Sequence, residues 1–331
     1  MPLRSILCAI FIGLFVVGQP LAKPLVIAHR GASGYLPEHT LESAVLAYSQ
    51  GADFIEQDLV LSKDNVLVVL HDIHLDTVTN VEQQFPERHR PDGRYYVIDF
   101  SLAELQTLRV HERTDQQGKM VFSSRYQGRA DFRIATFEEQ LELISQLNRM
   151  TGKQVGFYPE IKSPAWHRQQ GRDISKMVLA TLRKHQLDDP NKAVYIQSFD
   201  FAELKRWRHE LGAKVKLVQL LGENDWHEAS TNYDYLKTAE GLAEIATVAQ
   251  GIGPWLAQVI DQQTFASTGL AEAAHKAGLA VHPYTFRQDS LPDNVQTSQL
   301  FALLFGQLQI DGLFSDFPDI TVRYLQDKPV D

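Results

Sequence analysis

The side chains best suited to chemistry lie in one stretch, residues 53–72, which reads DFIEQDLVLSKDNVLVVLHD. Glu56 and Asp58 are two positions apart in a β-type apolar run, so they point to the same face of a predicted strand, about 7 Å apart along it. The polar residues 62–65 allow a tight hairpin, because a parallel neighbour would need a crossover of about a dozen residues or more. The second apolar run therefore returns antiparallel and brings His71, at its end, towards both carboxylates.

The rest of the chain supplies the elements that would position these residues. Beyond Thr136, which forms a capping box with Glu139, apolar runs of strand length alternate with helical segments. This alternation predicts an α/β fold with a mostly parallel sheet. With residues 66–70 assigned to the hairpin, the predicted strands centre near residues 27, 56, 158, 196, 218, 253, 282 and 314. Eight such βα units predict a TIM (β/α)8 barrel.

Two segments complicate this pattern. The run at residues 251–255 also fits a loop, and a doubly wound open sheet is the structural alternative, although no G-x-G-x-x-G follows any predicted strand. Residues 73–135 contain prolines and many charges, with one helical signal in the capping box of Ser101 and Glu104. We interpret residues 73–135 as an insertion after the hairpin, within one barrel domain over residues 23–331.

Three carboxylates are predicted to meet at one end of this barrel. The active site of a TIM barrel lies at the C-terminal ends of its strands, where Glu56, Asp58 and Glu160 fall. Like charges so close would raise each other's pKa unless a cation neutralised them. Oxygen ligands without thiolates favour a hard divalent cation, Ca²⁺ first and Mg²⁺ as the alternative.

The same strand ends carry groups that could transfer protons and bind a phosphate. His29 and His71 are the candidate acid and base, since both fall beside the carboxylates and histidine titrates near neutral pH. Arg30 offers a bidentate fork for a phosphoryl group and Lys162 offers a point charge, although each could instead form a salt bridge. The nearby histidines could support the site without catalysing; they are His39, His74 and His282.

Composition restricts the compartment and the partners. A basic residue, Arg4, precedes the apolar run 6–17 and a small residue, Ala22, which predicts a secretory signal over residues 1–22 with cleavage near Ala22 and export to the periplasm. The run is too short for a membrane anchor, which needs about 20 apolar residues. Cys8 lies inside the predicted signal, so the mature chain would have no thiol.

The charge of the chain argues against polyanionic partners. Removal of Arg4 with the signal changes the net charge from −9 to −10, and no basic run is present. The chain is therefore a poor candidate for binding nucleic acid or an anionic membrane surface. We expect a small-molecule partner and either a monomer or a homodimer.

Several segments together resemble the glycerophosphodiester phosphodiesterase family, in the family's order and across essentially the whole mature chain. They are HRGA at 29–32, PEHT at 37–40, E-x-D at 56–58, HD at 71–72, PEIK at 159–162, QSF at 197–199, HPYT at 282–285 and DGLFSDFP at 311–318. With its export signal and insertion, the chain most resembles the bacterial periplasmic members. His39, Tyr284 and Ser315 stand where the family more often has Asn, Trp and Thr, which bears on substrate fit.

The resemblance implies a metal-dependent hydrolysis of glycerophosphodiesters, such as glycerophosphocholine and glycerophosphoethanolamine, to glycerol 3-phosphate and an alcohol. It implies that Glu56, Asp58 and Glu160 hold the cation, and that His29 and His71 act as acid and base. It also implies that Arg30 and Lys162 bind the phosphate.

Three other functions fit parts of the pattern. A phospholipase-D-like lyase would need an apolar or basic rim, which the polar insertion does not supply. A non-catalytic binding protein would need neither two histidines nor three carboxylates at one mouth. A metal-dependent sugar isomerase would leave Arg30 and Lys162 without a phosphate to bind.

Overall fold

A computed structural model of the protein describes residues 23–292 and 295–327. The predicted signal, residues 1–22, lies outside the described residues. Among the helices that are described, none is long and apolar enough to cross a bilayer.

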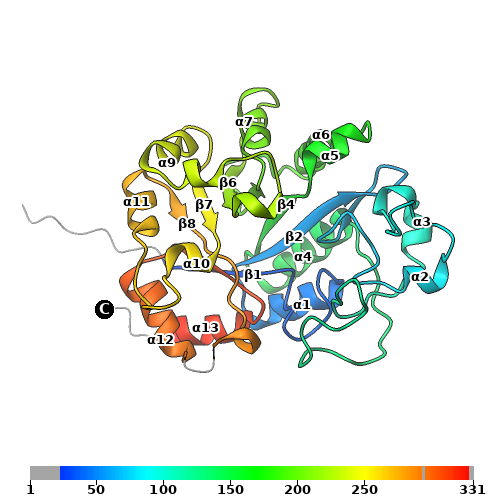
Figure 1. Cartoon of the computed structure of the whole chain (residues 1–331), viewed down its shortest axis with the longest axis horizontal. Helices are drawn as coiled ribbons and strands as arrows, with labels where there is room; N and C mark the ends of the chain where they lie inside the picture. Colours follow the sequence, from blue (N-terminus) through cyan, green and yellow to red (C-terminus); the bar gives the residue numbers. More distant parts are fainter. Residues whose placement is uncertain (1–22, 293–294, 328–331) are drawn as a thin grey trace, which may run out of the picture.

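Within the described residues, eight parallel strands form a nearly closed barrel with helices around it, which confirms the predicted TIM barrel (Figure 1). The strands are β1 (Leu25–Ala28), β2 (Phe54–Leu61), β4 (Gly156–Ile161), β5 (Tyr195–Ser198), β6 (Lys216–Leu221), β7 (Gly251–Pro254), β8 (Ala280–Val281) and β9 (Gly312–Ser315). They are paired in the order β8-β7-β6-β5-β4-β2-β1-β9. The seam beside β8 is bridged by backbone hydrogen bonds, for example from the N–H of Phe286 to the carbonyl of Phe314 at 2.8 Å.

The predicted hairpin is present as well. Strand β3 (Leu67–Val69) pairs antiparallel with β2, with Val69 opposite Leu59, and takes no place in the barrel order. Asn65 has a φ of 65° in the connection, a left-handed conformation that asparagine tolerates better than most residues. The segment at 251–255, which also fitted a loop, contains strand β7, paired with β6 and β8.

The longer helices cover the outside of the barrel, and most of them begin at side-chain caps. Thr40, Asp173 and Asp200 each accept a hydrogen bond from the backbone of the first turn, and Thr136 forms its capping box with Glu139. The longer helices are α1 (Leu41–Gln50), α4 (Phe137–Thr151), α6 (Ile174–Lys184), α7 (Phe201–His209), α9 (Ala239–Ala246), α11 (Leu270–Lys276) and α13 (Pro318–Asp327).

Two predicted helices differ from the structure. The predicted helix 236–249 is divided into α8 (Tyr233–Leu236) and α9, because the Thr238 side chain caps a new helix by accepting from the N–H of Gly241. The predicted helix 299–308 begins earlier, as α12 (Thr297–Phe301), and continues as a π-type turn, η4 (Ala302–Gln307).

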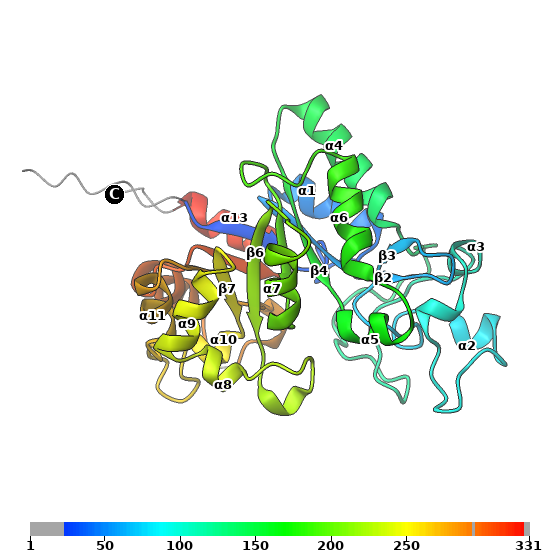
Figure 2. The same ribbon diagram turned by 90° about the horizontal axis from the view of Figure 1, so that it is seen from above.

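Residues 73–135 lie beside the barrel, next to the hairpin (Figure 2). They contain α2 (Val81–Gln84), the 3-10 helix η1 (Val97–Asp99) and α3 (Leu102–Leu105), the last with the expected capping box of Ser101 and Glu104. Their apolar side chains form a hydrophobic cluster with the outward face of the hairpin, where Val60 and Val68 lie. The segment therefore has a core of its own, separate from the larger core between barrel and helices.

Candidate active site

The three predicted carboxylates lie together at the C-terminal end of the barrel. Asp58 of β2 is in register with Glu160 of β4, and Glu56 precedes Asp58 by two residues on the same face. One oxygen from each carboxylate lies within 4.8 Å of the others, and all three residues are buried, none more than 5% exposed. Parallel pairing thus places the side chains of Asp58 and Glu160 beside one another.

Each carboxylate is held by neighbours outside the cluster. Glu56 accepts from the side chain of Gln197 at 2.8 Å and from the backbone N–H of Arg30 at 2.9 Å. The imidazole Nε2 of His39 lies 2.7 Å from Asp58 Oδ2. Lys162 Nζ lies 2.8 Å from Glu160 Oε1. These contacts leave Asp58 Oδ1 buried without a hydrogen-bond partner.

Burial of the cluster changes the protonation of its members. Burial and then the charge of Asp58 raise the pKa of Glu56 well above its usual range, and burial raises the pKa of Glu160 to about 8 against the opposing effect of Lys162. Burial alone would raise the pKa of Asp58, but His39, His71 and Lys162 together outweigh it and hold that pKa well below its usual range. Without added positive charge the cluster therefore retains protons near neutral pH.

The cluster fits a divalent cation. It offers three buried carboxylates with converging oxygens, an unpartnered Asp58 Oδ1 and raised pKa values on two members. Oxygen-only ligands of this kind suit the hard cations Ca²⁺ and Mg²⁺. Glu56, Asp58 and Glu160 are thus the residues that would hold it.

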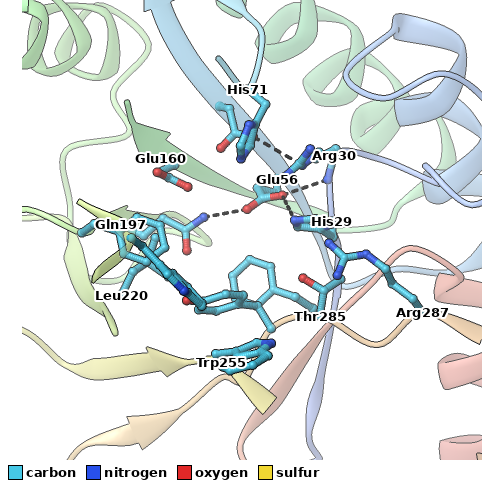
Figure 3. A pocket seen from close by; sticks show the side chains of 15 residues that line it. His29, Arg30, Glu56, His71, Glu160, Gln197, Leu220, Trp255, Thr285 and Arg287 are labelled. Carbon is cyan, nitrogen blue, oxygen red and sulfur yellow. Dashed lines mark hydrogen bonds and ion pairs between the residues drawn. The ribbon is translucent and has the colours of Figure 1, made fainter. Parts of the chain in front are cut away.

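Both predicted histidines line the same cavity (Figure 3). The Nδ1 of each contacts a carboxylate. His29, which follows β1, lies 2.6 Å from Asp316 Oδ1, and its Nε2 is 3.8 Å from Glu56. His71, at the end of the hairpin, lies 2.7 Å from Asp72 Oδ1. Burial and then the charge of Arg30 lower the pKa of His29 to about 4 and that of His71 to about 3, so both rings are neutral near pH 7.

The cations of the site are arranged differently from the prediction. Arg30 lines the cavity and bonds Glu38 through Nη1 at 3.0 Å. Lys162 is buried on Glu160 and is absent from the described residues that line the cavity, so it forms the ion pair that the sequence left as its alternative. Arg287, to which the sequence gave no role, lines the cavity and donates to Asp316 from Nε at 3.1 Å.

The remaining walls of the cavity are largely apolar. The cavity has a volume of about 270 Å³, with an aromatic side that sequence reasoning missed (Figure 3). Trp226 and Trp255 meet edge to face with ring centroids 5.4 Å apart, and the Tyr284 hydroxyl donates to the carbonyl of Leu221. The side chains that complete this wall are Phe199, Leu220 and Phe314. One side of the cavity is therefore charged and the other apolar.

This fold and site define a TIM-barrel enzyme whose mouth combines a buried cluster of three carboxylates with two histidines. Residues 29–320 match the model of the glycerophosphoryl diester phosphodiesterase family. The chain belongs to this family, and its activity is that of a glycerophosphodiester phosphodiesterase.

Individual relatives agree with this placement. A glycerophosphodiester phosphodiesterase of Haemophilus influenzae is 43% identical, over 93% of this chain and 91% of the relative. One of Treponema pallidum is 39% identical over 92% of each. Among solved structures, a glycerophosphoryl diester phosphodiesterase from Silicibacter pomeroyi superposes with a TM-score of 0.70 at 24% identity, covering 92% of this chain and 95% of that one.

Proposed function

We propose that the protein hydrolyses glycerophosphodiesters of small alcohols, such as glycerophosphocholine and glycerophosphoethanolamine, to glycerol 3-phosphate and the alcohol. The observation that carries this proposal is the placement of His29 and His71 around one cavity with the carboxylate cluster. A phosphodiesterase from Oleispira antarctica, of the same fold at a TM-score of 0.63 and 22% identity, was solved in complex with the product sn-glycerol-3-phosphate, which matches the proposed product. The small cavity suits a soluble diester.

The two histidines divide the proton transfers. Asp316 and Asp72 accept from Nδ1 of His29 and His71, which leaves each Nε2 for the substrate. One neutral ring takes the proton of the nucleophile at Nε2. The other ring acts as an imidazolium, which its aspartate and the negative phosphate of the bound diester stabilise, and gives its Nε2 proton to the departing alcohol oxygen. The nucleophile is water or the 2-hydroxyl of the glycerol, and detection of a cyclic glycerol phosphate during turnover would distinguish them.

Charged side chains supply the other part of catalysis. A divalent cation held by Glu56, Asp58 and Glu160, Ca²⁺ or Mg²⁺, would stabilise the negative charge that builds on the phosphate oxygens. Arg30 lies on the same side of the cavity and provides a guanidinium for the phosphate. Lys162 acts indirectly, because its Nζ pairs with Glu160 and holds that carboxylate in place.

Activity on glycerophosphocholine tests the proposal directly. We expect turnover by the purified protein, loss of it with a chelator and recovery with Ca²⁺ or Mg²⁺. His29→Ala and His71→Ala should each lower kcat by about a hundredfold or more. His209→Ala, which changes an exposed histidine on the outer helix α7, is the matched control and should retain activity. Normal turnover in either cavity variant would exclude the assigned roles.

Export is proposed from the sequence alone. The segment 1–22 has the basic, apolar and small-residue order of a cleavable secretory signal. Mass measurement of the protein recovered from a periplasmic fraction is expected to show cleavage near Ala22. A full-length mass in the cytoplasmic fraction would contradict export.

A further inference from the structure

Arg113, from the insertion, connects two carboxylates of the active site. Its Nη2 and Nε bond Glu38 at 2.6 and 3.0 Å, and its Nη1 bonds Asp72 Oδ2 at 2.6 Å. Asp72 uses its other oxygen for His71, and Glu38 also accepts from Arg30. The guanidinium of Arg113 thus fixes Asp72, the partner of His71, and Glu38, the partner of Arg30.

Arg125, from the same insertion, has the equivalent place on the other side of the cavity. Its Nη2 bonds Asp316 Oδ2 at 2.6 Å, while Asp316 Oδ1 holds His29. It also forms a fork with Asp289, at 2.8 and 3.1 Å, and its guanidinium stacks on Phe122 with the carbon 3.6 Å from the ring centroid. The side chain of Arg125 is 4% exposed, so its charge is buried.

We propose that Arg113 and Arg125 are positioning residues, which hold His71 and His29 in their catalytic orientation through Asp72 and Asp316. This inference rests on the proposed roles of the two histidines. The insertion then supplies residues that complete the active site.

The physical basis is that each aspartate gives one oxygen to a histidine and the other to arginine. Asp72 Oδ2 accepts from Arg113, and Asp316 Oδ2 accepts from Arg125 and Arg287. Without Arg113 the Asp72 carboxylate, whose side chain is 28% exposed, would rotate or bind water. Without Arg125 the buried Asp316 would keep only Arg287 on that oxygen. The planar guanidinium fixes the carboxylate plane, and that plane fixes the imidazole. Catalytic groups tolerate displacements of only about 0.5 Å.

Backbone hydrogen bonds and apolar packing in the insertion fix the position of Arg113. The N–H of Thr114, next to Arg113, donates to the carbonyl of Thr77 at 2.9 Å, and the N–H of Val121 donates to the carbonyl of Arg113. Val110 belongs to the buried cluster of the insertion and pairs with Phe132. The core of the insertion therefore sets where Arg113 stands.

The first test is Arg113→Met, assayed on glycerophosphocholine with saturating cation. We expect kcat to fall about 10- to 100-fold, the usual range for loss of an orienting partner. The matched control is Arg109→Met, which removes an exposed ion pair to Asp131 in the same insertion and should leave kcat within about twofold. A normal kcat in folded Arg113→Met would overturn the inference.

A double-variant cycle shows through which carboxylate Arg113 acts. If it acts through Asp72, Arg113→Met adds little to the kcat already lost in Asp72→Asn. If the two losses multiply, or if only KM changes, Arg113 acts through Glu38 and Arg30, and the assignment to His71 is wrong. Should Arg113→Met fail to fold, Arg113→Lys keeps the charge without the fork, and a wild-type kcat there would also refute the inference.

The Arg125 half is tested in the same way with Arg125→Met and Asp316→Asn. If the double variant loses little more kcat than Asp316→Asn alone, Arg125 acts through Asp316. If the two losses multiply, this part of the inference is wrong. Wild type and His71→Ala are measured alongside. If wild type does not hydrolyse the diester, the proposed function has failed; if wild type is active, His71→Ala is inactive and Arg113→Met is normal, only the positioning inference has failed.

Discussion

Replacement of Glu160 by Gln should reduce the thermal stabilisation that a divalent cation gives to this protein. Glu56, Asp58 and Glu160 present converging oxygens in a buried cluster, and two of the three have raised pKa values. A cation bound there stabilises the folded state alone, because the unfolded chain does not bring residues 56 and 160 together. Glutamine keeps the shape of the side chain and removes one of the three charges.

The size of the effect follows from binding linkage. A cation at about 1,000 times its Kd stabilises the folded state by about 4 kcal/mol. Unfolding entropy of about 2.1 cal/mol/K per residue gives about 0.6 kcal/mol/K for a chain of roughly 300 residues, so Tm should rise by about 6 °C. If the lost charge weakens binding about a hundredfold, the rise at the same concentration falls to about 2 °C.

Differential scanning calorimetry in chelator and in millimolar Ca²⁺ or Mg²⁺ measures both shifts. Comparison of the shift within each variant removes any difference in the starting Tm. The matched control is Glu82→Gln, an exposed glutamate on α2 that should leave the shift unchanged. Equal shifts in wild type and Glu160→Gln, or no shift with either cation, would refute the assignment of the cluster as a cation site.

Three further perturbations test other parts of the structure. Cation affinity should rise with pH from about 6 to 8, because Glu56 and Glu160, whose pKa values are raised, the latter to about 8, must lose protons to bind; titration calorimetry in buffers of different ionisation enthalpy should detect proton release, and none would contradict this. Glu112→Gln should raise Tm above pH 7 and change it little near pH 4. Burial raises the pKa of Glu112 to about 7, so the folded state loses stability as pH rises from the pKa of the unfolded chain to that value. An equal change of Tm at both pH values would exclude this cause. Trp255→Ala should raise KM for glycerophosphocholine several-fold with kcat nearly constant, because Trp255 belongs to the apolar wall of the cavity; a selective loss of kcat would place it in the chemistry.

Much of the barrel was predictable because its signals are local. The capping box of Thr136 and Glu139 and the cap of Asp200 lie within four residues of chain, so the helices beginning there were visible in the sequence. The hairpin was predictable from the short polar connection between two apolar runs. The predicted helix 236–249 was wrong in its continuity because a threonine in mid-pattern, Thr238, has the alternative of capping a new helix.

The carboxylate cluster was predictable for a geometric reason. Alternation in β2 puts Glu56 and Asp58 on one face, and a parallel barrel puts the end of β4 beside the end of β2. Lys162 shows where this reasoning stops. Spacing allows a lysine two residues after Glu160 either to face the substrate or to fold back on the glutamate, and the structure has the ion pair.

The orienting partners of the histidines were beyond local reasoning. Arg113 bonds Glu38 from 75 positions away, and Arg125 bonds Asp316 from 191 positions away. Both arginines stand in irregular backbone, where no periodicity says which way a side chain points. A charge-rich stretch with prolines is most often a solvated surface, and this composition concealed two arginines that point inward.

The arrangement separates cation binding from proton transfer. Glu56, Asp58 and Glu160 are held by groups of the barrel and its first loop, namely Gln197, His39 and Lys162. Asp72 is held by Arg113 of the insertion, and Asp316 by Arg125 of the insertion together with Arg287. The insertion has its own hydrophobic cluster, so it can loosen without opening the barrel core. Loosening would release the histidines while the carboxylates stay in place, and the enzyme would lose turnover before it lost its cation.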